Sequence, residues 1–316
     1  MALGEFELIR KFFTRPPRRS DVSLSVGDDC ALLRPEPGKC VAMTVDTLVE
    51  GIHFLAGTHP TGLGHKALAV SLSDLAAMGA KPAWITLALT MPQSDEAWLS
   101  MFASGLLALA ERYYVELVGG DTTRGPLSVT VQAMGFVNEG EALRRSGTQV
   151  GDGIYLTGDL GLAGLGLEIV TGRIDLYAPE AVVKLERPEP RVQAGMALAG
   201  LASGCIDVSD GLAADLGHLL EPSGLGATLD WTALPLPSAV RRYFKAGGDE
   251  WMPLRSGDDY ELCFTVSPQW EDELVRRMAD FDCSCMRIGR VEWEPGLRLQ
   301  KDRRVLPLEA WGYQHF

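Results

Sequence analysis

The chain has 316 residues, of which 46% are hydrophobic, and it is longer than one hydrophobic core usually serves, so two domains are expected. Its 42 acidic residues outnumber 29 basic ones and give a formal net charge of -13, which excludes nucleic acid as a partner held by phosphate attraction. No stretch approaches about 20 consecutive apolar residues, and charges interrupt the N-terminus, so we expect a cytoplasmic protein without a signal peptide or a membrane partner.

Apolar segments rich in β-branched residues alternate with helical patterns in the first half of the chain. Strands are expected at 41–45, 84–90 and 127–137. Residues 63–78 carry apolar side chains at helical spacing, and Gly79 and Pro82 beyond them are helix-stop signals. A second helix is expected over 95–112. The polar stretch 138–153 interrupts this alternation and indicates a domain boundary.

The second half of the chain shows the same mixture of elements. Strands are expected at 154–159, 205–208 and 261–266. A helix is expected over 211–220, with Ser209 or Asp210 as its N-cap. Strands and helices in both halves indicate an α/β or α+β protein with two layered domains, which we expect to span residues 1–138 and 139–316.

The usual nucleotide-binding motifs are missing from the sequence. Neither the phosphate-loop pattern G-x-x-x-x-G-K-[ST] nor the protein-kinase loop set occurs. The string GLGHKA at 62–67 fits a loose dinucleotide-binding pattern, but it follows a loop and not a strand, so we interpret it as the entry to a helix. Any chemistry on nucleotides must therefore come from other residues.

Short acidic motifs lie where a strand ends or where a helix starts or stops. One aspartate in a turn is ordinary, because its side chain bonds to nearby backbone, but the set indicates carboxylates gathered around Mg²⁺. Asp74 lies near the end of its helix, where the dipole disfavours an anion unless a cation offsets it. Thr44 projects to the same side of its strand as Asp46. The motifs contain Asp28, Asp29, Asp46, Asp74, Asp121, Asp207 and Asp210.

Several further residues have both a functional and a structural interpretation. Ser209 and the N–H groups of the helix after it would bind a phosphate oxygen, or Ser209 is a plain N-cap. Arg145 in the boundary loop would grip phosphate, or it is a solvated charge. His53 is a substrate contact or a hydrogen-bonded structural histidine, and Trp311 is a packing anchor or a platform for a cationic heterocycle.

With these residues assembled, the chain resembles the thiamine-monophosphate kinase family, in the superfamily that includes aminoimidazole ribonucleotide synthetase and selenophosphate synthetase. The resemblance covers nearly the whole chain. It rests on long motifs in the right order, of which the stretches at 64–80 and 119–125 are the most specific. These motifs are GDDCALL, TVDTLVEGIHF, GHKALAVSLSDLAAMGA, GGDTTRG, RRSG, IDVSDGLAADL, SGDDYELCF and WGYQHF.

The resemblance implies transfer of the ATP γ-phosphoryl group to thiamine monophosphate, giving thiamine diphosphate, with several Mg²⁺ ions as cofactors. It also implies the two-domain aminoimidazole ribonucleotide synthetase-like fold. In that fold, an N-terminal domain with a mixed sheet binds ATP and Mg²⁺ and pairs in a homodimer. A C-terminal α/β sandwich domain completes the nucleotide and substrate site.

The resemblance assigns roles residue by residue. The implied metal ligands are Asp29, Thr44, Val45, Asp46, Asp74, Asp121, Asp207 and Asp210, of which Asp74, Asp121 and Asp210 are also catalytic. The implied ATP contacts are Gly120, Asp121, Arg145 and Ser209. The implied substrate contacts are His53, Glu261 and Trp311. Val45 stands where the family often has threonine; if the backbone there is the ligand, little changes. Whether Asp28 or Asp29 faces the metals stays open.

Two other functional classes fit parts of the pattern. A metal-dependent phosphohydrolase also uses acidic metal sites, there to activate water. A non-catalytic nucleotide sensor would bind ATP without turnover. For the kinase, we expect direct in-line attack by a substrate phosphate oxygen, which needs no strong general base because a phosphate monoester, with a second pKa of about 6, is largely ionised at pH 7.

Overall fold

The computed structural model describes residues 4–281 and 283–315. The chain forms two compact units, one of Met1–Leu75 with Ala80–Gly140 and one of Ala76–Gly79 with Glu141–Phe316. The first unit ends at Gly140 and the second continues from Glu141, within the polar stretch 138–153. In the part of the chain that the structure describes, no helix has the length and apolar character needed to cross a membrane.

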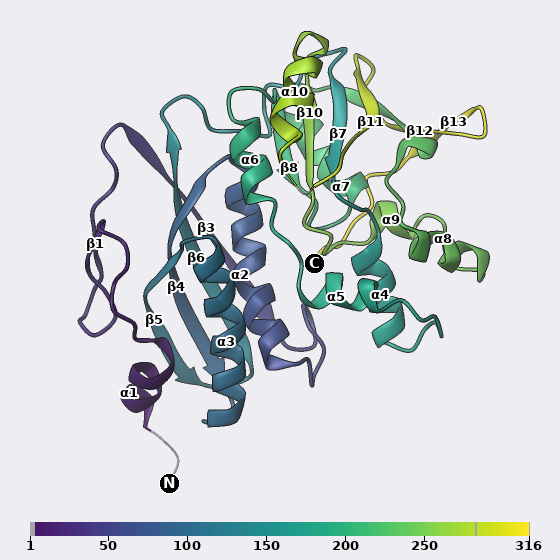
Figure 1. The fold of residues 1–316 in the computed structure, drawn as a ribbon. Helices are drawn as coiled ribbons and strands as arrows, with labels where there is room; N and C mark the ends of the chain where they lie inside the picture. The colour runs from purple at the N-terminus through teal and green to yellow at the C-terminus, as the bar shows by residue number, and fades with distance from the viewer. Residues whose placement is uncertain (1–3, 282, 316) are drawn as a thin grey trace. The chain divides into compact units, whose positions relative to one another are not determined.

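The first unit is built on a four-stranded mixed sheet with the strand order β3-β6-β4-β5. Its strands are β3 (Lys39–Val49), β4 (Lys81–Met91), β5 (Glu116–Arg124) and β6 (Ser128–Asn138). The pairs β3–β6 and β6–β4 are antiparallel, whereas β4–β5 is parallel. Helices α2 (Pro60–Ala77) and α3 (Glu96–Arg112) cover one face of this sheet (Figure 1). We call the opposite face, which carries the exposed side chains of Val41, Met43, Val45 and Ala88, the open face.

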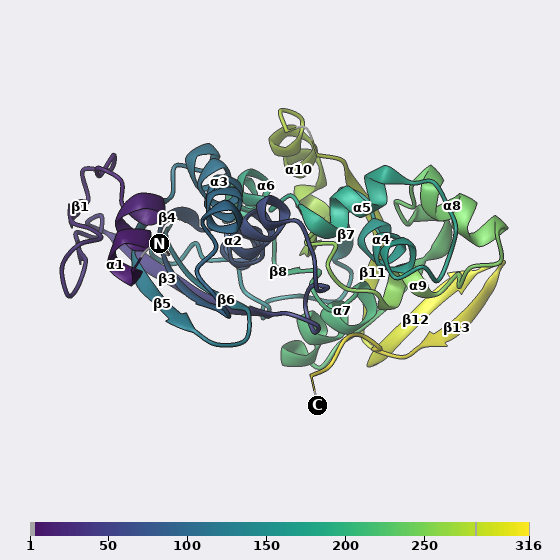
Figure 2. The same cartoon turned by 90° about the horizontal axis from the view of Figure 1, so that it is seen from below.

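Two glycines allow α2 and α3 to lie against each other. A Cβ atom at Gly64 of α2 would stand 2.1 Å from the carbonyl oxygen of Phe102, and one at Gly105 of α3 would stand 2.0 Å from that of Thr61. Only a hydrogen fits at these positions, so the two backbones are in contact. Figure 2 shows the two helices side by side over the sheet. The remaining elements of this unit are α1 (Glu5–Leu8), a π-helix (Ile9–Phe13), β1 (Val22–Leu24) and β2 (Leu32–Leu33).

The second unit contains a seven-stranded sheet with the order β13-β12-β9-β11-β7-β10-β8. All its neighbouring strands are antiparallel except β12 and β9. The strands are β7 (Gly153–Thr157), β8 (Gly204–Asp207), β9 (Gly226–Asp230), β10 (Leu262–Val266), β11 (Cys285–Glu292), β12 (Gly296–Lys301) and β13 (Arg304–Leu308). All seven contribute residues to one buried core cluster.

Helices pack on both sides of this larger sheet. One buried cluster joins residues such as Ile154 and Cys263 of the sheet to α4 (Leu162–Val170), α5 (Pro179–Glu186), α7 (Leu212–Leu220), α8 (Ser238–Lys245) and α9 (Met252–Arg255). Tyr155 and Phe264, which alternate with those residues, stack on each other with ring centroids 5.7 Å apart. Burial and the nearby Glu271 of α10 (Glu271–Met278) raise the pKa of Tyr155, and α10 contacts α6 (Val192–Leu198). The unit is therefore a layered α/β sandwich.

The six strands expected from the sequence are all present, with bounds shifted by a few residues. The two long helices are also confirmed, since α2 begins three residues before the expected start and α3 follows Asp95, whose carboxylate accepts the N–H groups of Ala97 and Trp98. The expectation for the N-cap of α7 was wrong. Gly211 is the N-cap, and neither Ser209 nor Asp210 supplies a capping bond.

Candidate active site

Two carboxylates from different elements face each other in the first unit. Asp46 on β3 accepts a hydrogen bond of 2.7 Å from Ser71 on α2, and Asp74 in the last turn of α2 accepts one from Thr44 on β3. Burial and the negative charge of Asp74 raise the pKa of Asp46 to about 6. Two half-buried carboxylates and a hydroxyl are hard oxygen donors of the kind that Mg²⁺ prefers, and a dication would remove their repulsion.

Val45 and Asp121 lie apart from this carboxylate pair. Asp46 pairs with Val131 of β6, Val131 with Leu87 of β4, and Leu87 with Gly120 of β5, so Gly120 stands three strand spacings, about 14 Å, from Asp46. Asp121 pairs with Ala88, whose exposed side chain belongs to the open face. Val45 is 62% exposed, and because successive side chains of a strand point to opposite faces, it lies on the face opposite to Asp46. The sheet therefore stands between Asp121 and the carboxylate pair.

Gly120 has a conformation that other residues rarely adopt. Its φ is 153°, and a Cβ atom there would lie 1.9 Å from the carbonyl oxygen of Leu87. Only glycine fits this approach of two backbones. The position therefore presents backbone and no side chain, immediately before the exposed carboxylate of Asp121.

Two loops of the first unit carry the other expected residues. The side chain of Asp28 accepts the N–H of Asp29 at 2.9 Å, so Asp28 closes the turn while the exposed Asp29 follows it. His53 lies just beyond β3, and its Nδ1 accepts the N–H of Val49 at 3.0 Å. A neutral imidazole that accepts at Nδ1 carries its proton at Nε2. His53 thus has its donor group at Nε2.

Two acidic segments run alongside each other in the second unit. Asp207 is buried at the end of β8, and the next residues bond through their backbone to the segment before β10. The N–H of Asp258 donates to the carbonyl of Ser209 at 2.9 Å, and the N–H of Tyr260 to that of Val208 at 2.8 Å. Asp258 and Tyr260 have φ values of 68° and 48°. Such left-handed conformations of non-glycine residues cost free energy and concentrate at functional sites.

The turn before α7 is held by Asp215, a residue that the sequence did not single out. Its Oδ2 accepts the N–H groups of Asp210 and Gly211, each at 3.0 Å, and burial raises its pKa to about 7. The side chains of Ser209 and Asp210 therefore do not cap the helix. Burial also raises the pKa of Asp210, and the nearby charges of two histidines and of Arg145 oppose this shift. Arg145 and Asp210 are thus brought close enough to interact.

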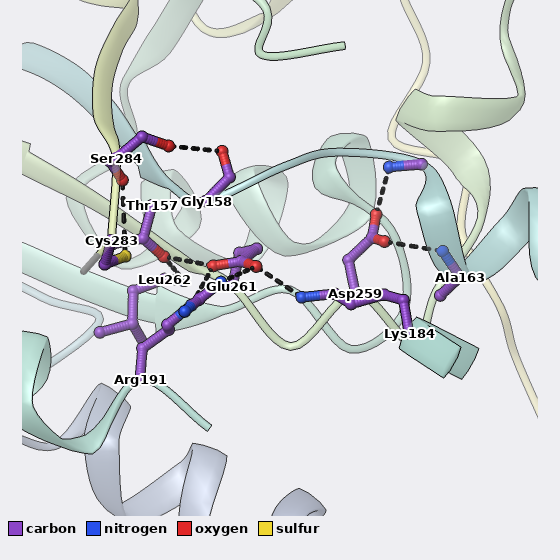
Figure 3. A network of polar contacts seen from close by, with 11 residues as sticks. Thr157, Gly158, Ala163, Lys184, Arg191, Asp259, Glu261, Leu262, Cys283 and Ser284 are labelled. Atoms are coloured by element: carbon purple, nitrogen blue, oxygen red, sulfur yellow. Dashed lines mark hydrogen bonds and ion pairs between the residues drawn. The ribbon is translucent and has the colours of Figure 1, made fainter. Parts of the chain in front are cut away.

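Glu261 lies at the centre of a buried charge network. The side chain is fully buried, and Figure 3 shows its carboxylate between Lys184 and Arg191. Lys184 donates at 2.5 Å, Arg191 donates through Nε at 2.6 Å and Nη2 at 2.7 Å, and Thr157 at 2.8 Å. Lys184 and Arg191 keep 11% and 17% of their side chains exposed, so the network reaches the surface through its cations.

Asp259, beside this network, organises the start of α4. The residue is fully buried, and its carboxylate accepts the N–H of Gly161 at 2.7 Å and that of Ala163 at 3.1 Å. Burial raises the pKa of Asp259 to about 7, against the attraction of Lys184 and these two bonds. The start of α4 is thereby filled by a carboxylate of the protein itself.

Trp311, the expected aromatic platform, lies next to the turn that carries Asp210. The N–H of Tyr313, two residues on, donates to the carbonyl of Asp210 at 3.0 Å. Trp311 is 48% exposed, and the guanidinium carbon of Arg255 lies 4.1 Å from the centroid of its ring. The second unit thus combines an aromatic face with the carboxylate of Asp210 and the charge of Arg145.

No group of three or more His, Cys, Asp or Glu side chains converges on one point within residues 4–281 and 283–315. Each acidic motif by itself supplies one or two carboxylates. That donor set fits a metal such as Mg²⁺, which keeps several waters and is completed by substrate phosphates, better than a metal that needs a closed protein cage.

Comparisons with known proteins agree over the whole chain. Residues 27–137 match the N-terminal domain of AIR synthase related proteins, and residues 149–302 match their C-terminal domain. The thiamine-monophosphate kinase of Escherichia coli is 45% identical over 322 residues, which cover 100% of this chain and 99% of that protein. That of Haemophilus influenzae is 42% identical over 324 residues, with coverage of 100% and 99%.

Solved structures extend this agreement to three dimensions. Thiamine-monophosphate kinase from Stenotrophomonas maltophilia is similar with a TM-score of 0.87 and 42% identity, covering 96% of this chain and 99% of that one. AaThiL complexed with AMPPCP and TMP is similar with a TM-score of 0.79 and 29% identity, covering 98% and 96%. Escherichia coli HypE, a hydrogenase maturation protein, shares the fold at 19% identity and a TM-score of 0.79. The resemblance and the fold class expected from the motifs are thereby confirmed, and the chain belongs to the thiamine-monophosphate kinase family of AIR synthase related proteins.

Proposed function

We propose that this protein transfers the γ-phosphoryl group of ATP to thiamine monophosphate and so makes thiamine diphosphate, the last step of thiamine diphosphate biosynthesis. The observation that carries the proposal is the full-length identity of 42% to 45% with thiamine-monophosphate kinases. A relative with the same fold binds AMPPCP and TMP, an ATP analogue and the acceptor. We expect the enzyme in the cytoplasm, where ATP is made available to biosynthesis.

We propose that Mg²⁺ ions bind to the carboxylates of both units. In the first unit, the pair Asp46 and Asp74 with the Thr44 hydroxyl supports this role, because their repulsion is relieved by a dication. Asp29 fits better than Asp28, whose carboxylate closes a turn. At Val45 only the backbone is a suitable donor. The remaining proposed ligands are Asp121, Asp207 and Asp210. The bound ions would neutralise charge on the phosphates of ATP.

We propose the following contacts with ATP and with the acceptor. Gly120 would let a phosphate approach the backbone next to Asp121. Ser209 and Arg145 would hold phosphate oxygens near Asp210, since the Ser209 hydroxyl is not used as a helix cap. The proposed acceptor contacts are His53, Glu261 and Trp311. Both oxygens of Glu261 accept bonds from other side chains, so the acceptor would meet Glu261 together with Lys184 and Arg191.

The chemistry needs positioning and charge neutralisation more than proton transfer. A phosphate oxygen of thiamine monophosphate attacks the γ-phosphorus in line, a new P–O bond forms, and the bond to the β-phosphate oxygen breaks to release ADP. The attacking monoester is largely ionised at pH 7, because its second pKa is about 6, so no catalytic histidine is required. Asp74, Asp121 and Asp210 would be the catalytic carboxylates that hold the reacting groups in place.

We further propose that the protein is a homodimer that pairs through the open face of the four-stranded sheet. Three apolar side chains of β3 are exposed on that face, Val41 by 43%, Met43 by 65% and Val45 by 62%. A contiguous apolar stripe on one strand is typical of an interface. Residues 1–138 would then bind ATP and Mg²⁺ and form the dimer, and residues 139–316 would complete the nucleotide and acceptor site.

Phosphorus NMR tests the proposed reaction directly. The protein is mixed with Mg-ATP and thiamine monophosphate, and the two signals of thiamine diphosphate should appear together with those of ADP. Inorganic phosphate as the sole product would show a phosphohydrolase, and unchanged ATP after binding would show a nucleotide sensor. Omission of Mg²⁺ should stop the reaction.

A further inference from the structure

The face of Trp311 is occupied by a cation of the protein itself. The guanidinium carbon of Arg255 lies 4.1 Å from the centroid of the Trp311 ring and 5.8 Å from that of Trp251. A planar cation over a tryptophan ring is attracted by the negative face of the π-system. Trp311 is therefore already shaped and placed as a cation-binding surface.

The Arg255 side chain is held weakly at every other point. Its Nη1 lies 3.8 Å from the Asp249 carboxylate, which is beyond hydrogen-bond distance, and both side chains are partly exposed. Its Nε is buried and forms no hydrogen bond, the sole such side-chain nitrogen or oxygen in the described part of the chain. A buried donor without a partner is costly, so movement of the side chain into solvent or towards an anion would relieve it.

Both residues lie at the turn on which the proposed function depends. Tyr313, two residues after Trp311, donates its N–H to the carbonyl of Asp210. The backbone of Arg255 packs against Gly211, where a Cβ atom would stand 2.7 Å from the Arg255 carbonyl oxygen. An aromatic face beside a phosphate-binding turn suits a ligand with a planar cationic ring at one end and a phosphate at the other. The thiazolium ring of thiamine monophosphate has this charge and shape.

We propose that Arg255 is a specificity-determining residue that occupies the Trp311 face in the absence of substrate, and that the cationic ring of the acceptor binds there by displacing it. This proposal rests on the proposed function. Guanidinium and thiazolium are both cations, so they repel each other and do not share the face of Trp311. A neutral ring is attracted less strongly to the π-system, so it would displace Arg255 less readily. Arg255 therefore weakens binding of the acceptor while it keeps the aromatic face ordered.

Calorimetry of thiamine monophosphate binding in the presence of AMPPCP tests this displacement. Arg255→Gln should lower the Kd of thiamine monophosphate by about 3-fold to 10-fold, equivalent to about 0.7–1.4 kcal/mol at 1.4 kcal/mol per factor of ten. Trp311→Leu should raise the Kd. In the Trp311→Leu background, Arg255→Gln should change the Kd by less than about twofold, because the guanidinium and the acceptor no longer share a face.

Two further variants separate displacement from a structural role. Arg255→Lys keeps a cation over the ring and should keep the wild-type Kd, even if Arg255→Gln folds poorly. Arg112 of the first unit also lies over an aromatic ring, with its guanidinium carbon 4.9 Å from the centroid of Tyr113, so Arg112→Gln should leave the Kd unchanged. A raised or unchanged Kd in Arg255→Gln would overturn the proposal. Failure of the wild-type protein to make thiamine diphosphate would instead overturn the proposed function.

Discussion

Asp46 and Asp74 repel each other across a short distance, and the fold keeps them together. The shift of the Asp46 pKa to about 6 records both its burial and the charge of Asp74. Asp74 also lies in the last turn of α2, where the helix dipole disfavours an anion. The same arrangement therefore costs stability, and the proposed dication would relieve that cost.

Asp74→Asn should move activity and stability in opposite directions. Loss of one proposed ligand should lower kcat by about 100-fold or more, whereas removal of the repulsion should raise the free energy of unfolding without Mg²⁺ by about 0.5 kcal/mol. Product formation and urea denaturation measure the two effects. Asp95→Asn is the matched control, because asparagine caps α3 as well as aspartate does, and it should change neither value. Normal turnover in Asp74→Asn would exclude Asp74 as a ligand.

Asp259 should make stability depend on pH. Its carboxyl has a pKa of about 7 in the folded protein and about 3.9 in the unfolded chain. Between these values the folded state holds a proton that the unfolded state has lost. The free energy of unfolding should therefore fall as pH rises from about 4 to about 7, by at most about 1.4 kcal/mol per pH unit from this group.

Urea denaturation at several pH values between 5 and 8 measures this dependence. Asp259→Asn should reduce the slope, and it should cost about 1–3 kcal/mol at pH 5, because the amide cannot accept both the Gly161 and the Ala163 N–H. Burial raises the pKa of Asp46 and Asp215 as well, so part of the slope should remain. The exposed N-cap variant Asp95→Asn should keep the full slope. An undiminished slope in Asp259→Asn would contradict the assignment.

Sequence reasoning at the residue scale found the residues whose motifs are short and local. Thr44 and Asp46 share a side of β3 because strand alternation requires it, and Asp74 lies in the last turn of α2 as its spacing predicts. Asp215, Lys184 and Arg191 were missed, since their partners are set by tertiary contacts. For Asp215 a signal existed, because an acidic residue in the first turn of a helix often accepts backbone N–H groups before it.

At the scale of elements, glycine decides how closely α2 and α3 pack. Helix propensity alone says that glycine inside a helix is destabilising compared with alanine by about 1 kcal/mol. The 2.0 Å approach of a Gly105 Cβ atom to the Thr61 carbonyl reverses that expectation. Glycine at position 105 is thus a packing requirement, despite its low helix propensity.

Gly105→Ala should therefore lower the free energy of unfolding by about 2 kcal/mol, because the two helices must move apart. The exposed neighbour Ser104 provides the control, and Ser104→Ala should change stability by less than about 0.5 kcal/mol. Urea denaturation compares the two variants at one pH. A gain of stability in Gly105→Ala would mean that the helices separate at little cost.

In the four-stranded sheet of the first unit, the strand that sequence reasoning missed is β5. Two glycines and an aspartate in ELVGGDTTR are typical of a loop, yet residues 116–124 pair in parallel with β4 over their whole length. Pairing with the buried strand β4 and the close approach of Gly120 to the Leu87 backbone override the preference of these residues for a loop. Strands β9, β11, β12 and β13 were missed as well, because each contains Gly, Pro or charged residues of kinds that are depleted in strands.

At the scale of the whole molecule, the exposed apolar stripe on β3 calls for a partner. Met43→Glu places a charge in the middle of that stripe and should convert a dimer of twice 34.2 kDa into a monomer. Light scattering during gel filtration at micromolar protein measures the mass. Met101, 37% exposed on α3, is the control, and Met101→Glu should leave the dimer intact. A wild-type protein that runs as a monomer would rule out the proposed pairing.

The stack of Arg255 on Trp311 also bears on how the reaction ends. Thiamine diphosphate carries the same thiazolium ring as the acceptor, so under the proposed displacement the guanidinium would also compete with the product for the face of Trp311. After phosphoryl transfer, the return of Arg255 to Trp311 would help to expel the product and would shorten its residence time. An internal cation that weakens binding of substrate can in this way speed turnover when release is slow.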